Sequence, residues 1–329
     1  MKEKVLITGA SGFLGYHIIN AAFEANLDVY AAIRQNSNVK HLEHLPIKYI
    51  QLDYRNIDAM AQEIADKQYS YIVHAAGITK SIKEEAYDQI NNVFTTNLAL
   101  AAAKNVGCIK KFVFVSSLAA GGPLNSLDGC IKENTQPKPV TAYGRSKLNA
   151  ENNISKLNFP VIILRPTAIY GPREKDIFIV TNTINKGLDL YIGKKTQKLS
   201  FVHGKDVGNI AIKSLHIPNV SGIYNITDGH NYTRYDYAAI VKQILNKKAF
   251  QLHLPESLIR IALFGVEQVN KLLKQAAPVS REKLQELLAI NWSCDISKAT
   301  TELNFSPMYN LKEGLEETIA WYKTNKWIK

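Results

Sequence analysis

The sequence has too few cysteines to suggest a disulfide framework or a zinc site. Its 329 residues contain three, Cys108, Cys130 and Cys294, an odd number at wide spacings and without a CxxC pair. Reduced thiols in a cytoplasmic protein are the simpler interpretation. The chain also lacks any run of about 18 apolar residues, the length that a membrane-spanning helix needs. We therefore expect no stable membrane insertion.

The sequence is short of acidic residues and of the residues that mark disordered or fibrous chains. With 18 glycines and 11 prolines it is neither collagen-like nor low in complexity, and its 46% apolar and 21% charged residues are typical of a soluble globular protein. Lys and Arg number 40 against 29 Asp and Glu, a net charge of +11 that suits nucleic acid, an anionic membrane or a phosphorylated small molecule. Because the basic residues are spread along the chain without a nucleic-acid motif, we expect a generally basic surface and no nucleic-acid partner.

Short apolar segments alternate with helical patterns through the first half of the chain. Strands are predicted at 4–8, 28–33, 47–52, 71–74, 111–116 and 160–164, and helices at 13–25, 57–65, 97–104 and 142–156. This alternation predicts an α/β fold with a doubly wound parallel sheet. Ligands of such sheets bind beyond the carboxyl ends of the strands, so the chemistry is expected in the loops after Thr8, Ile33, His74, Ser116 and Arg165.

The second half has a different, mostly helical pattern. A strand is predicted near 199–202 and helices at 206–215, 234–245, 255–273 and 311–322. We expect a first domain over 1–170, its sheet completed by segments near 199–230, and a smaller, mostly helical part over 171–329 that binds the substrate. The helix at 255–273 is amphipathic, and its apolar stripe is expected to face the core or another subunit, with a membrane surface as the alternative. That stripe consists of Leu258, Ile261, Ala262, Gly265, Val269 and Leu272.

A glycine-rich turn joins the first predicted strand to the first predicted helix. Residues 8–15 read TGASGFLG, a GxxGxxG spacing. Glycines let the backbone turn tightly and approach a pyrophosphate, and the following helix offers free N–H groups at the positive end of its dipole. The alternative is a merely tight strand–helix turn. The turn predicts a dinucleotide site formed by Gly9, Ser11, Gly12, Phe13, Leu14 and Gly15.

The segment after the second strand lacks the acid that commonly binds the ribose 2′-hydroxyl of NAD. It reads AIRQN at 32–36, and the guanidinium of Arg34 can pair with a 2′-phosphate, with Lys40 in support. We therefore predict a preference for NADP, with NAD as the alternative cofactor. If Arg34 is only a solvated loop residue, that preference fails.

The candidate catalytic pair is Tyr143 and Lys147, whose i, i+4 spacing puts both side chains on one face of a predicted helix. A phenol with a pKa of about 10 is too protonated to act as a base at neutral pH, and a neighbouring ammonium lowers that pKa. The pair is therefore suited to proton transfer. Ser116 and Ser117 end the strand predicted at 111–116, where a hydroxyl can hold a substrate carbonyl. Strand-end capping is the alternative role for these serines.

These motifs, with others along nearly the whole chain, resemble those of the extended short-chain dehydrogenases/reductases of the NAD-dependent epimerase/dehydratase family. The resemblance implies a Rossmann-type fold, a nicotinamide cofactor and a homodimer through helices near Asn97 and Tyr143. The shared segments are TGASGFLG at 8–15, Leu52-Asp53, HAAG at 74–77, Asn97, FVSS at 114–117, YGRSK at 143–147, Arg165-Pro166, YGP at 170–172, FVH at 201–203 with Asp206, and Trp292 with Asp295.

The resemblance also implies a role for each matching position. Tyr143 would be the general acid/base, and Lys147 would hold the nicotinamide ribose and lower the pKa of Tyr143. Ser117 would bind the reacting oxygen, with Ser116 the less favoured choice. By residue type alone, Arg165 would instead be a surface cation. The remaining cofactor contacts would come from Leu52, Asp53, Ala75, Ala76, Gly77, Asn97, Ser116, Arg165, Pro166 and Thr167.

Two reactions suit these residues. The first is NADP-linked hydride transfer to or from a carbonyl or secondary alcohol of a small molecule, favoured by Arg34 and by a resemblance to the dihydroflavonol-reductase and hydroxysteroid-dehydrogenase branch. The second is a nucleotide-sugar epimerase with tightly bound NAD. A non-catalytic cofactor sensor is disfavoured because both Tyr143 and Lys147 are present. Dehydration is disfavoured because residues 118–122 lack an acid pair, and no metal site is expected.

Overall fold

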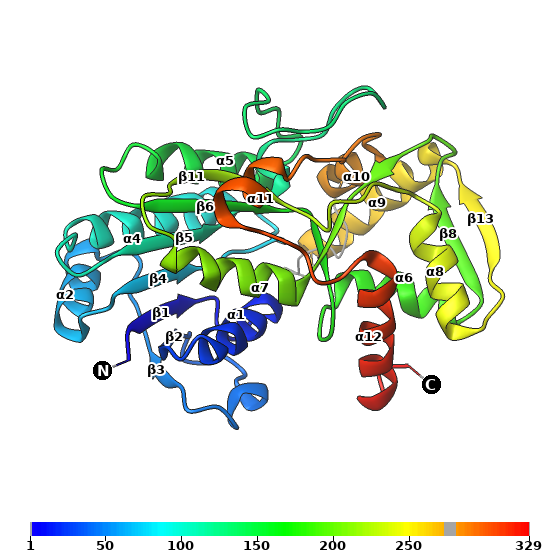
Figure 1. Cartoon of the computed structure of the whole chain (residues 1–329). Helices are drawn as coiled ribbons and strands as arrows, with labels where there is room; N and C mark the ends of the chain where they lie inside the picture. The colour runs from blue at the N-terminus through cyan, green and yellow to red at the C-terminus, as the bar shows by residue number, and fades with distance from the viewer. Residues whose placement is uncertain (1, 273–280, 329) are drawn as a thin grey trace.

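The fold is built on one seven-stranded parallel sheet. The computed structural model describes residues 2–272 and 281–328. The strand order is β11-β6-β5-β4-β1-β2-β3, and every neighbouring pair is parallel. Helices lie on both sides of the sheet (Figure 1), so the predicted α/β class with a doubly wound parallel sheet is confirmed. The strands of this sheet are β1 (Lys4–Thr8), β2 (Asp28–Ala32), β3 (Lys48–Ile50), β4 (Tyr71–His74), β5 (Lys111–Val115), β6 (Val161–Pro166) and β11 (Gly222–Ile226).

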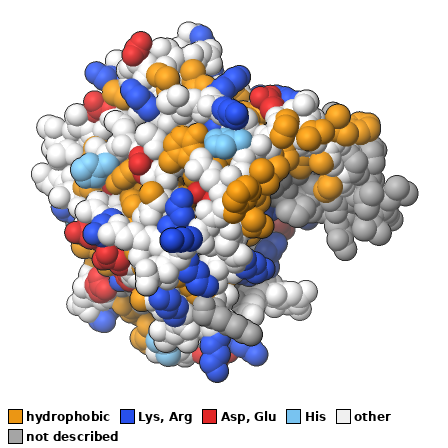
Figure 2. All heavy atoms as spheres, turned by 90° about the vertical axis from the view of Figure 1, so that its right-hand side faces the viewer, with side chains coloured by type: hydrophobic (Ala, Val, Ile, Leu, Met, Phe, Trp, Pro, Cys, Tyr) orange, Lys and Arg blue, Asp and Glu red, His pale blue; other side chains and the backbone are white. Residues whose placement is uncertain are grey.

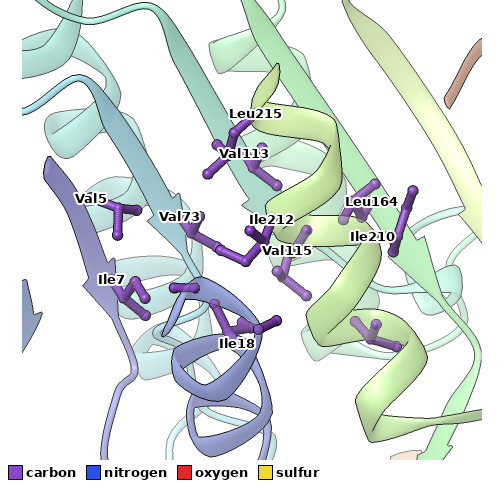
Figure 3. Close-up of a cluster of buried hydrophobic side chains, with 14 of the residues drawn as sticks. Val5, Ile7, Ile18, Val73, Val113, Val115, Leu164, Ile210, Ile212 and Leu215 are labelled. Atoms are coloured by element: carbon purple, nitrogen blue, oxygen red, sulfur yellow. The ribbon is translucent and has the colours of Figure 1, made fainter. Parts of the chain in front are cut away.

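The sheet divides the interior into two hydrophobic cores, because alternate side chains of each strand point to opposite faces. On β1, Val5 and Ile7 point to one core and Leu6 to the other. The first core is closed by α1 (Phe13–Glu24) and α7 (Gly204–Lys213), where Ile18 and Ile212 meet the valines of the central strands (Figure 3). The second core is closed by α2 (Ile57–Lys67), α4 (Phe94–Ala103) and α5 (Ala142–Ile154).

The helix before β5 is longer than the sequence pattern predicts. Instead of a single helix at 97–104, the chain is helical from Glu84 through α3 (Glu84–Tyr87), a π-helix (Asp88–Val93) and α4. The polar run around Asp88 hides this segment from a search for apolar periodicity. Its buried asparagines, Asn91 and Asn92, instead bind groups of the 78–92 segment and of α5.

The C-terminal part contains a third core and several short strands. The third core lies between α6 (Asp176–Asn185), α8 (Asp236–Leu245) and α12 (Leu311–Thr324). Three small two-stranded sheets accompany it: β7 (Ala168–Tyr170) with β10 (Phe201–His203), β9 (Lys198–Leu199) with β12 (Tyr232–Thr233), and β8 (Leu188–Ile192) with β13 (Phe250–Leu254). The sequence pattern missed α6, β8 and β13. The remaining helices are α9 (Glu256–Leu272), α10 (Arg281–Leu288) and α11 (Ser297–Leu303), with single 3-10 turns at Lys40–Leu42, Leu118–Ala120 and Ser214–His216.

The expectation that the apolar stripe of the 255–273 helix faces the core is wrong at its described positions. Leu258 and Ile261 of α9 are 60% and 69% exposed. The side chains of Val269 and Leu272, like residue 273, lie outside the described residues. Within the described part of the chain, no helix has the length and apolarity to cross a membrane.

Candidate functional site

At two positions, the glycine-rich turn after β1 has room only for glycine. Gly9 has a φ of +69°, and a Cβ there would lie 2.6 Å from the carbonyl carbon of Ala75. A Cβ on Gly15 would collide with the carbonyl oxygen of Gly9. The turn therefore presses the start of α1 against the end of β1. Helix α1 begins at Phe13, and its N-cap Gly12 provides no side-chain cap. With no acid in its first turn, the positive end of the helix is available to an anion.

A buried hydrogen-bond chain holds the loop after β4 beside this turn. The Thr8 hydroxyl lies 2.7 Å from Nδ1 of His74 and accepts from the backbone N–H of Ala76 at 3.2 Å. Nε2 of His74 lies 2.9 Å from the Thr95 hydroxyl. Burial lowers the pKa of His74 to about 3, so the ring is neutral and serves as a connector. The segment 75–77 is thereby fixed next to Gly9, as expected of two strands that are neighbours in the sheet.

Helix α5 brings the predicted catalytic residues to the same edge of the sheet. Thr141 caps the helix by accepting from the N–H of Gly144, and the Ser117 hydroxyl hydrogen-bonds Tyr143. Burial raises the pKa of Tyr143 to about 12, while the Ser117 bond opposes this rise. The structure thus brings Ser117 and Tyr143 together, as their predicted roles require.

Lys147 is more deeply buried than its i, i+4 spacing from Tyr143 indicates. Its ammonium donates to the carbonyl oxygen of Val115 at 3.1 Å and lies 4.7 Å from the centre of the Phe114 ring. Burial lowers the pKa of Lys147 to about 8. A Cβ on Gly77 would lie 3.4 Å from Nζ, so this ammonium borders the loop after β4. The sequence predicts that Lys147 lowers the pKa of Tyr143, but in the structure the lowering contribution comes from Ser117.

Beneath Tyr143 and Lys147 lies a buried ion pair between Glu151 and Arg165. The sequence analysis did not predict that these two residues pair. Glu151 follows Lys147 by one helical turn, and both it and Arg165 of β6 are almost fully buried. The Arg165 guanidinium donates to both Glu151 oxygens, with Nε–Oε1 and Nη2–Oε2 distances of 3.0 and 2.5 Å. The Ser116 hydroxyl donates to the same carboxylate at 2.5 Å. The interpretation of Arg165 as a surface cation is therefore wrong.

The sequence carried one signal for this ion pair. Tyr143, Lys147 and Glu151 recur at a spacing of four along α5, so their side chains share one face of the helix. The face that presents the candidate catalytic pair thus continues into the core. Ser116 points to Glu151 in that core, whereas Ser117 is half-buried and reaches Tyr143.

A second carboxylate reaches the site from the far end of the chain. The Thr141 hydroxyl donates to Oε1 of Glu286 on α10 at 3.1 Å. The negative charge of Glu286 raises the pKa of Tyr143 further. Trp292 donates from its indole N–H to the backbone carbonyl of Glu286 at 3.1 Å, which fixes this end of α10. Nothing in the local sequence around Glu286 indicates this contact, because it depends on how α10 docks.

The remaining predicted cofactor residues are spread along the same edge. Arg34 is exposed and borders, with Gln35 and Asn36, a hollow of about 430 Å³. Asp53 is exposed and accepts from the N–H of Arg55, and Leu52 before it is half-buried. Asn97 donates to the backbone oxygen of Tyr54 at 2.9 Å and so shapes the segment after Asp53. Pro166 ends β6, and the hydroxyl of Thr167 behind it is buried without a hydrogen-bond partner.

These features together fit a nicotinamide dinucleotide. The uncapped start of α1 suits a pyrophosphate, the ammonium of Lys147 and the unpaired hydroxyl of Thr167 suit the nicotinamide half, and Arg34 lies at the end of β2, where the adenine ribose is held in folds of this kind. Within the described residues, no group of three or more His, Cys, Asp or Glu side chains could hold a metal ion.

Known proteins resemble this chain over nearly its full length. The family model "NAD dependent epimerase/dehydratase family" matches residues 5–227. The UDP-glucose 4-epimerase of Vibrio cholerae is 26% identical, over 97% of this chain and 95% of that protein. The ceramide reductase of Caulobacter vibrioides is 24% identical, over 98% of this chain and 96% of that protein.

A solved structure shares the same fold. The crystal structure of UDP-glucuronic acid 4-epimerase from Bacillus cereus, in complex with UDP-glucuronic acid and NAD, matches with a TM-score of 0.76 at 22% identity. The match covers 98% of this chain and 99% of that chain.

Proposed function

We propose that this chain, which belongs to the NAD-dependent epimerase/dehydratase family of extended short-chain dehydrogenases/reductases, reduces a carbonyl, or oxidises a secondary alcohol, of a small molecule with NADP as its exchangeable cofactor. Family members of this kind are NAD(P)-dependent enzymes, and the match over 5–227 spans the glycine-rich turn and the Tyr143–Lys147 pair. Net redox turnover and the use of a phosphorylated cofactor are more specific than family membership.

The residues around Tyr143 supply the proton chemistry in this proposal. When bound, the nicotinamide ring supplies or accepts the hydride. Tyr143 donates the phenolic proton to the carbonyl oxygen in reduction and removes the hydroxyl proton in oxidation. Ser117 donates a hydrogen bond to the same oxygen, which holds it against the phenol. Lys147, positively charged below its pKa of about 8, holds the ribose hydroxyls.

The observation that carries the proposal is the segment after β2. It bears Arg34 and no carboxylate up to residue 42, so it offers a cation where a 2′-phosphate would lie and nothing to accept from a 2′-hydroxyl. A preference for NADP suits net redox chemistry.

Replacing Arg34 by Glu should weaken NADPH binding by about ten- to a hundredfold, because a charge-assisted bond worth about 1.5–3 kcal/mol is lost. Binding of NADH should stay within a few-fold of the parent value, which makes NADH the internal control. Dissociation constants follow from quenching of the intrinsic tryptophan fluorescence. Equal dissociation constants for the two cofactors in the unaltered chain would contradict the NADP preference.

Nucleotide-sugar epimerisation is the second candidate, and the likeness to UDP-glucose 4-epimerase over nearly the whole chain favours it. In that reaction Tyr143 would remove a proton and later return it. The keto sugar would rotate between the two hydride transfers. The cofactor would then stay bound and show no net change. The likeness to ceramide reductase favours the first candidate over a similar length of chain.

One assay separates the two candidates. The chain is incubated with a panel of ketones, long-chain acyl ketones, sterol-like alcohols and nucleotide sugars, each with NADPH and NADH or their oxidised forms. Net redox chemistry predicts an absorbance change at the reduced-nicotinamide band with a ketone or alcohol, larger with the phosphorylated cofactor. No absorbance change, but chromatographic conversion of a nucleotide sugar into its stereoisomer, would overturn the redox proposal and establish epimerisation.

A further inference from the structure

The small sheet β8–β13 carries an apolar face on its outer side. The strands are parallel and in register, so Leu188 pairs with Phe250, Leu190 with Leu252 and Ile192 with Leu254. Paired residues point to the same side of a sheet. The intervening residues of β8, Asp189 and Tyr191, are buried, and Lys242 of α8 pairs with Asp189 on this inner side. Their partners on β13 are more open, since Gln251 is exposed and His253 is half-buried.

The polarity of this sheet is reversed relative to an ordinary surface sheet. Strands that cover a core usually turn their apolar side chains inward and their polar ones outward. Here an aspartate faces inward, and four of the six outward side chains are clearly exposed, Phe250 most of all at 68%. A contiguous exposed apolar surface of this kind marks a contact site rather than a solvated face. We call these six residues the outer face.

Helix α9 extends the apolar surface. It follows β13 after the single residue Pro255, and its exposed Leu258 and Ile261 lie one turn apart on one side of the helix. Seen from the side on which β8 and β13 lie, the molecule shows hydrophobic side chains gathered in a continuous stripe, with Lys and Arg side chains beside it (Figure 2).

Lysines surround the outer face at both ends of its strands. Lys186 precedes β8 and Lys247 and Lys248 precede β13 at the same end, while Lys194 and Lys195 follow β8 at the other end. All five are exposed. Among the residues that the structure describes, none of the five has a carboxylate within ion-pairing distance, although Lys247 binds the backbone oxygen of Asn185.

We propose that the outer face, together with the first turns of α9, docks this protein on the surface of an anionic phospholipid bilayer. The apolar side chains would enter the boundary between headgroups and acyl chains, and the five lysines would meet the lipid phosphates. Each such lysine contributes attraction that falls with salt, because the surface potential is screened within a Debye length. The contact is peripheral and reversible.

Charge decides between a bilayer and a second copy of this chain. A two-fold interface would place the same surface against itself, so the lysines that flank one outer face would meet those that flank the other. Like charges brought together oppose such an association. An anionic bilayer offers the opposite charge over the whole area, so the basic rim and the apolar centre are both matched.

Docking goes beyond the proposed reaction. It requires neither cofactor nor substrate, so vesicle binding without either one tests docking independently of the proposed reaction. A bound chain that turns over neither a carbonyl nor an alcohol would leave docking in place and reject the redox proposal.

The test is sedimentation of the whole chain with vesicles of phosphatidylcholine alone and of phosphatidylcholine mixed with phosphatidylglycerol, at about 0.1 M and about 1 M salt. We expect binding to the mixed vesicles at low salt, at least tenfold weaker binding at high salt, and little binding to phosphatidylcholine alone. Equal binding to both lipids, or none to either, would overturn the proposal.

Two double variants locate the contact. Phe250→Ser with Ile261→Ser removes apolar area, and Lys194→Glu with Lys195→Glu reverses two charges; each should weaken binding to the mixed vesicles more than tenfold. The matched controls, Val106→Ser with Ile82→Ser and Lys67→Glu with Lys156→Glu, change exposed residues elsewhere and should bind as the parent does. Circular dichroism checks that all four variants fold.

The variants also reveal the alternative occupant. If analytical ultracentrifugation shows a dimer that Phe250→Ser with Ile261→Ser separates, while vesicle binding is unchanged in that variant, then the outer face binds a second copy and the bilayer proposal is rejected. Unchanged vesicle binding in both patch variants rejects it as well.

Discussion

Replacing Tyr143 by Phe should lower kcat by about a hundred- to ten-thousandfold while leaving cofactor affinity within a few-fold of the parent value. General acid–base groups contribute a factor of this size, and the phenol is the group that Ser117 orients at the site. Phenylalanine keeps the ring, so the packing against Tyr87 at a ring separation of 6.5 Å survives. Turnover is measured with whichever substrate the panel assay identifies, and cofactor affinity is measured by fluorescence titration.

Ser117→Ala is the companion variant, because it alters the acidity of the phenol without removing it. Burial raises the pKa of Tyr143 to about 12, and the Ser117 hydrogen bond opposes that rise, so its loss raises the pKa further. Alcohol oxidation needs the phenolate, so the rise of its rate with pH should move to higher pH in this variant. A Tyr143→Phe chain with unchanged turnover would contradict the assignment of Tyr143 as the acid/base.

Replacing Glu151 by Leu should lower the free energy of unfolding by about 3–5 kcal/mol, the second large effect that we expect. The substitution leaves the guanidinium of Arg165 in the core without its carboxylate, and a lone buried charge is costly. The Ser116 hydroxyl loses its acceptor in the same step. Urea denaturation followed by circular dichroism measures the change.

A second substitution should restore the stability lost in Glu151→Leu. Glu151→Leu combined with Arg165→Met removes both charges, and the unfolding free energy should return close to that of the parent, because a buried pair contributes little over apolar side chains of similar volume. Asp28→Asn is the control: it breaks the Lys48–Asp28 surface pair and should leave the free energy of unfolding close to that of the parent. A double variant as unstable as Glu151→Leu would show that the arginine is needed for more than charge balance.

The same ion pair bears on Lys147. Its pKa is lowered to about 8 by burial, and the negative charge of Glu151 opposes this lowering. Glu151 is therefore a positioning residue: it keeps the Lys147 ammonium charged near neutral pH without touching a reacting atom. In Glu151→Leu, the pKa of Lys147 should fall. Activity that requires the protonated lysine should therefore be lost at a lower pH than in the parent.

Local patterns predicted well those parts of the molecule whose structure is set by neighbouring residues. The glycine spacing predicted the tight turn, since a side chain at Gly9 or Gly15 would strike backbone atoms. The buried strands were visible as short apolar runs, and their ends moved by only one or two residues. The α/β class followed from the alternation of strand and helix.

Contacts between distant segments were not visible in the sequence. Glu286 reaches Thr141 across 145 residues, and Arg165 meets Glu151 only because β6 lies beneath α5. An apolar stripe predicts that a helix has one apolar side, but it carries no information on what covers that side. For this reason the core-facing expectation for the 255–273 helix was wrong at Leu258 and Ile261.

By itself, the sequence determined the sheet class, the glycine turn at 8–15 and the candidate pair Tyr143–Lys147, because each depends on residue types within a few positions of one another. Only the tertiary structure decided which serine meets the phenol, that Arg165 is buried against a carboxylate, and that the outer face of β8 and β13 is apolar. Each of these depends on the docking of elements far apart in the chain. Burial then shifts the pKa of a side chain and raises the free-energy cost of a charge. No local sequence pattern shows either effect.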